Sequence, residues 1–269
     1  MLNISISCDG RDDPAKFIVR VDAGEQAGAA IVWIANHLFQ RDPVALASMA
    51  LARTNAMRVV LMAMSPFTIH PVQIAMAAAT LDEFFPGRVS VCLGVGAPAD
   101  LKAVGREAAK PLKAMREAIE IMRALFDGDM VHADNPTFSV LNRRLAAGRR
   151  SIPIVLAASG PQMLELAGAC ADGVLISAGA SVEFVKWTLD SVHRGAKGRS
   201  VRCHGLVYAA VDEEETKAHD RMRRILANLL RGAHHEANLR MAGSALDQEG
   251  LNRAVLREDW KQAESFITD

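Results

Sequence analysis

The sequence has few aromatic residues, no excess of either charge and no paired cysteines. Aromatic residues make up 5% of the 269 residues, and 31 basic residues are balanced by 31 acidic ones. A balanced charge provides no basic field that would attract nucleic acid or an anionic membrane. We therefore expect neither as a partner, and a phosphate-bearing small molecule would have to be held locally by backbone N–H groups and individual side chains.

The four cysteines are scattered and contain no C-x-x-C pair. Cys92 and Cys170 lie in apolar runs, and we interpret them as small core residues. The N-terminal segment has neither a basic region nor a long apolar run, so no signal peptide is predicted. Together these features favour a reduced, cytoplasmic setting.

One stretch without charges, residues 59–81, is long enough to cross a bilayer. Pro66 and Pro71 divide it, however, and it also contains Ser65, Thr68 and His70. Because proline interrupts a continuous helix, we interpret this stretch as a strand, a loop and a helix.

Short apolar runs alternate with longer runs of helical periodicity along most of the chain. This alternation indicates a parallel sheet with crossover helices, and the lack of a G-x-G-x-x-G motif after the first strand argues against a dinucleotide-binding fold. We predict an α/β fold, a (β/α)8 TIM barrel, forming a single domain over residues 1–269. Strands are predicted at residues 2–7, 30–34, 58–64, 89–93, 153–157, 173–176 and 201–211. Helices are predicted at residues 13–27, 43–54, 72–84, 99–126 (one helix or a broken pair), 161–170 and 182–193, and after Asp212 as the N-cap.

Two parts of the chain depart from a regular barrel. Residues 127–150 are polar and are predicted to form an insertion or lid loop. After Glu213 the sequence is helical or irregular up to Asp269, so the eighth strand is expected to be lacking or truncated.

Histidines and glycines, with few carboxylates, follow the predicted strands, where a barrel of this kind has its active site. His37 follows the second strand and is the candidate catalytic acid or base, because imidazole gains and loses a proton near neutral pH. The alternative is a structural histidine that donates to a backbone carbonyl. His70 is interpreted as orienting its loop, and His234 and His235 as surface residues without metal spacing. No metal site is predicted.

Two loops between a strand and a helix are candidate phosphate-binding sites: Ser159–Gly160 and Ala178–Gly179. Glycine lets the backbone approach a phosphate, and the helix N-terminus supplies free N–H donors. Glycine is also ordinary turn chemistry at such junctions, which is the competing explanation. After the fourth strand, Gly94 and Gly96 would let a flat ring lie close to the backbone.

Five stretches of the sequence, taken together and in this order, resemble the bacterial luciferase-like family. The similarity is closest to its F420-dependent, methylene-tetrahydromethanopterin-reductase-like branch, and covers about residues 1–210. The matching stretches are residues 33–43, 65–71, 79–88 running into 93–96, 152–161 and 171–177.

This resemblance implies a flavoprotein-like oxidoreductase that uses F420 or FMN for hydride transfer or monooxygenation of a small organic substrate. It also implies a homodimer or higher homo-oligomer. A non-catalytic flavin-binding member of the family is the second hypothesis. An unrelated phosphate-binding barrel, such as an aldolase or isomerase, is the third.

The resemblance also assigns residues. The cofactor ring would lie over a bulge in the third strand, with a cis non-prolyl peptide near Met62–Ala63. The family's Asp–His pair falls on Asn36–His37, and its phosphate loops fall on the two glycine loops named above. Asn36 replaces an aspartate, Met62 a glycine and Ile69 an arginine. The first replacement removes a charge that would stabilise a protonated His37.

Overall fold

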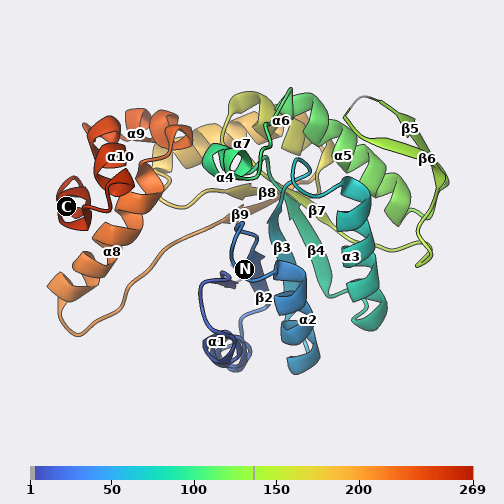
Figure 1. The fold of residues 1–269 in the computed structure, drawn as a ribbon, viewed down its shortest axis with the longest axis horizontal. Coiled ribbons are helices and arrows are strands. Elements are labelled where there is room, and N and C mark those ends of the chain that lie inside the picture. Colours follow the sequence, from blue (N-terminus) through green and yellow to red (C-terminus); the bar gives the residue numbers. More distant parts are fainter. Residues whose placement is uncertain (1–3, 136, 269) are drawn as a thin grey trace. The chain divides into compact units, whose positions relative to one another are not determined.

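The computed structural model describes residues 4–135 and 137–268 (Figure 1). Seven strands follow one another in the sheet order β1-β2-β3-β4-β7-β8-β9, and β5 and β6 form a separate pair. This is the predicted α/β architecture. The chain divides into two compact units, which are described separately: unit 1 contains residues 1–157 and 170–173, and unit 2 contains residues 158–169 and 174–269.

Unit 1 contains five neighbouring strands of the sheet, and each pairs in parallel with the next. Their side chains are largely buried, as expected for parallel strands covered on both faces, and this explains why they appear in the sequence as continuous apolar runs. The strands are β1 (Ile6–Cys8), β2 (Ile31–Ala35), β3 (Arg58–Met64), β4 (Val89–Leu93) and β7 (Ile154–Ala157).

The helices of unit 1 each begin with a proline in the first turn, where its missing N–H costs nothing. Asp13 and Asp42 accept hydrogen bonds from first-turn N–H groups, at 2.9 Å from the nitrogen atoms of Lys16 and Val44. Contacts pack α2 on β2 and β3, and α3 on β4 and α5. The helices are α1 (Pro14–Gln26), α2 (Pro43–Arg53), α3 (Pro71–Phe84), α4 (Pro98–Ala103) and α5 (Pro111–Phe126).

The predicted helix over residues 99–126 is a broken pair, α4 and α5. The chain leaves α4 through Gly105, whose positive φ of 66° ends the helical path. Pro111 then starts α5. Since proline lacks an N–H group, it cannot continue an α-helix from the residues before it.

Residues 127–150, predicted to be an insertion or lid loop, are not irregular throughout: they contain an antiparallel hairpin of β5 (Val131–Asp134) and β6 (Ser139–Arg143). The Asn135 side chain accepts a hydrogen bond from the Phe138 N–H at 2.9 Å and so stabilises the turn. Val131, Phe138 and Val140 are buried, whereas their neighbours along the strands are mostly exposed. A two-stranded ribbon with one buried face has too little apolar content to be recognised by composition.

Unit 2 alternates strands and helices and then becomes entirely helical. The predicted strand at 201–211 ends early, at Gly205, and Val207 and Val211 beyond it are exposed. The next helix begins at Glu215, and Asp212, the predicted N-cap, instead accepts a hydrogen bond from the Glu214 N–H at 3.2 Å. The elements are α6 (Pro161–Cys170), β8 (Gly173–Ile176), α7 (Val182–Ala196), β9 (Arg202–Gly205), α8 (Glu215–Leu230), η1 (Ala233–His235), α9 (Glu236–Met241), α10 (Gln248–Leu256) and α11 (Trp260–Ser265).

Helices α8, α10 and α11 of unit 2 have a small hydrophobic core of their own. It consists of Ala227, Leu251, Ala254, Val255, Ala263 and Ile267. Within the described residues 206–268 there is no strand, in agreement with the expected lack of an eighth one. Throughout the described part of the chain, no helix combines the length and hydropathy needed to cross a membrane.

Candidate functional site

The C-terminal ends of β2 and β3 come together in unit 1 around the Met62–Ala63 peptide bond. This bond is cis, as the resemblance implies. The Asn36 N–H donates a hydrogen bond to the Met62 carbonyl oxygen, and the Asn36 side-chain nitrogen lies 3.4 Å from the Ala63 carbonyl oxygen. The structure therefore places three of the predicted site residues in direct contact.

Gly94 and Gly96, at the end of β4, join this cluster. The Gly94 N–H donates to the Met64 carbonyl oxygen at 3.1 Å, and a Cβ atom at Gly94 would lie only 2.8 Å from the Ala63 Cβ. Real Cβ atoms almost never approach so closely, so glycine is required here. Gly96 has a φ of 95°, and Ser65 fixes the preceding residue by donating from Oγ to the Val95 carbonyl oxygen at 2.7 Å.

We call this cluster of Asn36, Met62, Ala63, Gly94 and Gly96 the unit 1 edge. It contains mostly backbone and small or uncharged side chains. Such a surface lets a flat molecule approach the main chain, and it has no carboxylate that would repel a phosphorylated cofactor.

His37 follows the unit 1 edge in sequence, and its side chain is exposed. Asp9, at the end of β1, is the nearby carboxylate that the sequence analysis missed. Burial acts to raise the pKa of Asp9. Hydrogen bonds and charge from Arg11, followed by the charge of His37, outweigh burial and lower it. Asp9 therefore carries a negative charge at neutral pH, and it forms an ion pair with Arg11. Its position directly after a strand was the available signal.

His70 has a structural role, as the sequence predicts. Its Nδ1 accepts a hydrogen bond from the Val72 N–H at 3.2 Å, which caps α3, and its ring packs edge-on against Phe138 at 5.6 Å between centroids. Burial lowers the pKa of His70, which favours the neutral ring that can accept this bond. His70 orients its loop and is not a candidate proton carrier.

In unit 2, the loop Ser159–Gly160 leads into α6. The Gly160 carbonyl oxygen accepts the first helical hydrogen bond, from the Leu164 N–H at 2.9 Å. Gly160 is exposed, and a Cβ atom there would have no heavy atom within 4 Å. The first turn of α6 carries no acidic residue. Free N–H groups at an open, acid-free helix N-terminus are a suitable site for a phosphate.

The second predicted loop, Ala178–Gly179, leads into α7 and is held by a residue that the sequence analysis did not identify. Gly179 has a φ of 70°, and Ser181 caps α7 by accepting from the Phe184 N–H at 3.2 Å. The buried side chain of Asn238 donates to the Gly179 carbonyl oxygen at 2.7 Å and accepts from the Ser181 N–H at 2.8 Å. We call residues 178–181 the unit 2 loop.

One turn before Asn238, the structure corrects a prediction. His234 is exposed, but His235, expected at the surface, is only 3% exposed. Burial, and secondarily the charge of His234, lowers the pKa of His235 to about 4. Its Nε2 has no hydrogen-bond partner. Sequence alone could not reveal this burial, because it depends on how the short helices after α8 pack.

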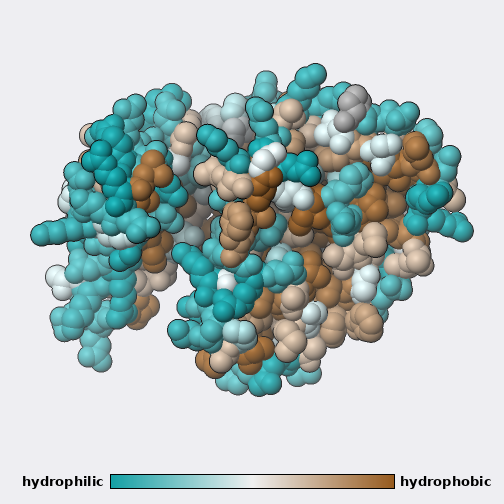
Figure 2. All heavy atoms as spheres, viewed as in Figure 1, coloured by the Kyte–Doolittle hydropathy of each residue, from teal (hydrophilic) through white to brown (hydrophobic). Residues whose placement is uncertain are grey.

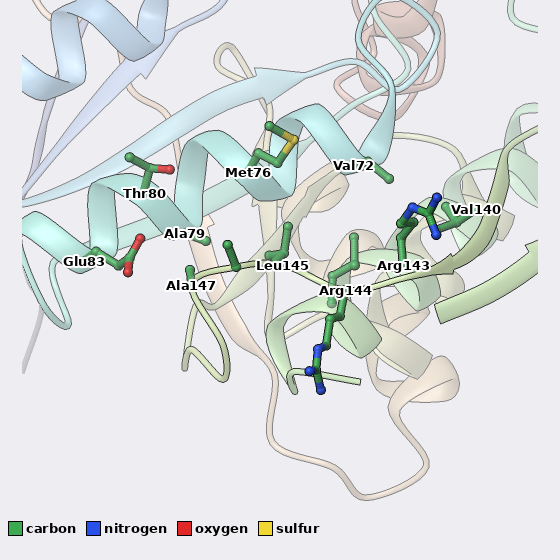
Figure 3. A pocket seen from close by; sticks show the side chains of 12 residues that line it. Val72, Met76, Ala79, Thr80, Glu83, Val140, Arg143, Arg144, Leu145 and Ala147 are labelled. Carbon is green, nitrogen blue, oxygen red and sulfur yellow. The ribbon is translucent and has the colours of Figure 1, made fainter. Parts of the chain in front are cut away.

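A cavity of about 390 Å³ lies in unit 1 on the outer side of α3, next to β6 and the segment that follows it (Figure 3). Apolar side chains form most of its wall, including Val72, Met76 and Leu145, and Arg143 and Arg144 lie at its border. None of the predicted site residues lines it. It is therefore separate from the unit 1 edge.

Comparison with known proteins identifies similar chains. A family model described as luciferase-like monooxygenase matches residues 5–269. A 5,10-methylenetetrahydromethanopterin reductase of Archaeoglobus fulgidus is 30% identical over 259 residues, covering 93% of this chain and 77% of that protein. An F420-dependent glucose-6-phosphate dehydrogenase of Nocardia farcinica is 33% identical over 171 residues, covering 59% and 51%.

Among solved structures, the F420-dependent tetrahydromethanopterin reductase from Methanopyrus kandleri matches with a TM-score of 0.85. The match is 22% identical and covers 100% of this chain and 83% of that one. At this identity the likeness establishes the fold, which is the predicted luciferase-like barrel. Across six curated relatives, the chain spans 51% to 77% of the relative's length.

Proposed function

This chain belongs to the luciferase-like monooxygenase family, and on that premise we propose that it is an oxidoreductase that uses F420 to transfer a hydride to or from a small organic substrate. Its relatives are reductases, dehydrogenases and monooxygenases, so the chain is an oxidoreductase of the class that works with F420 or FMN. F420 is the favoured cofactor because the curated relatives include F420-dependent dehydrogenases. Monooxygenation with FMN is the alternative.

The observation that carries the proposal is the composition of the unit 1 edge. Gly96 is exposed, and the buried Gly94 lets the main chain after β4 pack closely on Ala63, because a Cβ atom there would lie 2.8 Å from the Ala63 Cβ. This arrangement fits a flat ring resting against the backbone. Asn36, Met62, Ala63, Gly94 and Gly96 are the residues that would contact such a ring, which supplies the hydride-carrying chemistry when bound.

Unit 2, taken by itself, contains the two loops that we propose as phosphate-binding sites. Ser159–Gly160 fits a phosphate well, because the start of α6 is open and carries no acid. Ala178–Gly179 also precedes a helix N-terminus, but Glu183 lies in the first turn of α7. Its negative charge weakens the attraction for a phosphate there. We therefore assign the larger share of phosphate binding to Ser159–Gly160.

His37 is proposed to hold or deliver the proton that accompanies hydride transfer. Asn36 carries no charge. Asp9, directly after β1, is the carboxylate whose pKa the charge of His37 helps to lower, after the larger effect of Arg11. We propose that Asp9 takes the place of the carboxylate that the family pattern puts beside the histidine.

Cofactor binding tests this proposal directly. Purified protein is titrated with F420 and, separately, with FMN, and binding is followed by fluorescence; turnover is then measured with a panel of small alcohols, aldehydes and imines. We expect micromolar or tighter binding of F420 and its reduction or oxidation by at least one substrate. FMN binding with oxygen consumption would support the monooxygenase alternative, and binding without any turnover would support a non-catalytic role. If neither cofactor binds, the proposal is wrong.

We also propose that residues 1–269 act as a single domain and that the protein works in the cytoplasm.

We propose further that the chain forms a homodimer or higher homo-oligomer. Large hydrophobic side chains are exposed on unit 1 at Met49, Met76 and Phe84, and Figure 2 shows hydrophobic residues at the surface on the side that carries α3. The cavity beside α3 adds an apolar recess to this surface. A second copy that covered it would remove these side chains from water.

Light scattering after size exclusion measures this association. Met76→Glu places a charge among these exposed hydrophobic side chains and is expected to convert the oligomer to a monomer. Val19→Glu, at a residue of α1 that is also exposed, serves as the matched control and should leave the mass unchanged. A monomeric wild-type chain at all concentrations would contradict the proposal.

A further inference from the structure

Asn238 makes two hydrogen bonds that join α9 to the unit 2 loop, 57 and 59 residues away in the sequence. Its amide nitrogen donates to the Gly179 carbonyl oxygen at 2.7 Å, and its amide oxygen accepts from the Ser181 N–H at 2.8 Å. Both ends of the amide are used, so only a side chain with one donor and one acceptor at this position satisfies both partners.

These bonds determine the conformation of the unit 2 loop. The loop passes through Gly179 with a positive φ of 70°, and a Cβ there would lie 3.1 Å from a methyl carbon of Leu229. Asn238 is itself only 3% exposed. The loop is therefore fixed at Gly179 and again at Ser181, the residue that caps α7.

Asn238 also determines which N–H groups remain available at the start of α7. The Ser181 N–H is occupied by the Asn238 oxygen, and the Phe184 N–H is occupied by Ser181 Oγ. The N–H groups of Val182 and Glu183, between them, have no partner within the helix. The two hydrogen bonds thus orient these two donors.

We propose that Asn238 is a positioning residue for the cofactor phosphate: it holds residues 178–181 in the conformation that directs the first N–H groups of α7 to that phosphate. The inference rests on the proposed function, since it requires a phosphorylated cofactor. Asn238 lies in α9, outside the hydrophobic core that α8, α10 and α11 share. Removing its amide should therefore change the loop more than the stability of those helices.

The variant Asn238→Asp tests the assignment with almost no change in shape. The carboxylate has no donor, so it faces the Gly179 carbonyl oxygen with a second acceptor and adds a negative charge behind the phosphate site. Asn228→Asp makes the same chemical change at an exposed position of α8 in the same unit and serves as the control. Asn238→Ala removes both hydrogen bonds without adding a charge.

The readout compares each cofactor with its form lacking phosphate, namely FMN with riboflavin and F420 with its ring-and-ribityl portion. We expect Asn238→Asp to weaken binding of the phosphorylated form about tenfold or more and to leave the phosphate-free form within about twofold. Asn238→Ala should show the same selectivity with a smaller loss, and Asn228→Asp should match the wild type.

The contrary results distinguish a failure of the proposed function from a failure of the positioning role of Asn238. If the wild type binds neither cofactor, the proposed function fails, and the role of Asn238 fails with it. If the wild type binds and both Asn238 variants lose the two forms equally, or lose neither, only the positioning role is wrong. Unfolding of both variants, measured by circular dichroism, would assign Asn238 to stability and would also overturn the inference.

Discussion

The unit 1 edge and the unit 2 loop are held in place in different ways. At the unit 1 edge, main-chain hydrogen bonds and the close approach of Gly94 to Ala63 fix the geometry, next to strands that are buried. In the unit 2 loop, a single distant side chain, Asn238, fixes it. The first region should therefore be sensitive to added atoms, and the second to the loss of one amide.

The helices that support the two regions also differ. Helices α2 and α3 pack directly on the strands that form the unit 1 edge. Residues 233–241, which support the unit 2 loop, form a short 3-10 helix and a six-residue α-helix, and include a buried histidine with an unpartnered nitrogen. Short helices derive little stability from their own hydrogen bonds. We therefore expect the unit 1 edge, the proposed ring site, to be less sensitive to solution conditions than the unit 2 loop, a proposed phosphate site.

The largest expected effect concerns chemistry at the unit 1 edge. His37→Ala should lower turnover by about 10²- to 10⁴-fold, because it removes the proposed proton carrier. Cofactor affinity should change only a few-fold, since the backbone of the edge is unaffected. Asp9→Asn, which removes the carboxylate whose pKa the charge of His37 helps to lower, should give a smaller loss. Steady-state kinetics and cofactor titration measure both. Unchanged turnover in His37→Ala would remove His37 from the mechanism.

Adding one methyl group to the unit 1 edge should have the next largest effect. In Gly94→Ala the new Cβ lies 2.8 Å from the Ala63 Cβ, and the overlap should destabilise the protein by about 1–3 kcal/mol and weaken cofactor binding. Gly205→Ala, where a Cβ meets nothing within 4 Å, is the control. Urea denaturation measures the difference. Equal stability of the two variants would show that the edge can relax, against the contrast drawn here.

The pH dependence of stability should be dominated by the region behind the unit 2 loop. The pKa of His235 is about 4 in the folded protein against 6.5 for the free side chain, so between these values the unfolded chain binds more protons. Stability should fall by about 2 kcal/mol from pH 7.5 to pH 5 through this group.

His235→Leu removes the titrating ring, and urea denaturation at the two pH values should show a flatter response. The exposed His193→Gln is the matched control and should retain the wild-type slope. A wild-type protein as stable at pH 5 as at pH 7.5 would show that His235 is accessible to protons in the folded state.

The smallest expected effect distinguishes the two phosphate loops. Glu183→Gln removes the only acidic residue in the first turn of α7, and should strengthen binding of the phosphorylated cofactor by about two- to fivefold. The phosphate-free form should bind as before. Ser159→Ala tests the other loop. It should weaken phosphate binding, since the first turn of α6 carries no acid whose charge opposes a phosphate there. Weaker binding in Glu183→Gln would contradict the assignment.

The same contrast explains how much of the molecule could be predicted from sequence. The ends of the buried strands are marked by apolar runs, and the helix starts by proline and aspartate, so the strand order and the position of Gly94 and Gly96 after β4 could be predicted. Asn36, Met62 and Ala63 were indicated by the resemblance to the family. Asp9 was also accessible, since it directly follows β1.

Features that depend on packing between distant segments could not be predicted from the sequence. Neither the bridging amide of Asn238 nor the burial of His235 follows from any local pattern, since both arise from the arrangement of short helices around residues 178–181. The β5–β6 hairpin was missed for a related reason. Only one face of this ribbon is buried, so its composition is that of a polar loop.

Hydrogen–deuterium exchange with and without bound F420 tests the central claim most directly, because it reports on each loop separately. We predict slower exchange at residues 36–37 and 94–96, and at 159–160 and 178–181, with the last of these lost in Asn238→Asp. The segments that line the cavity beside α3, residues 72–83 and 140–147, should be unchanged by the cofactor. Protection confined to those cavity segments, with the strand-end loops unaffected, would contradict the account.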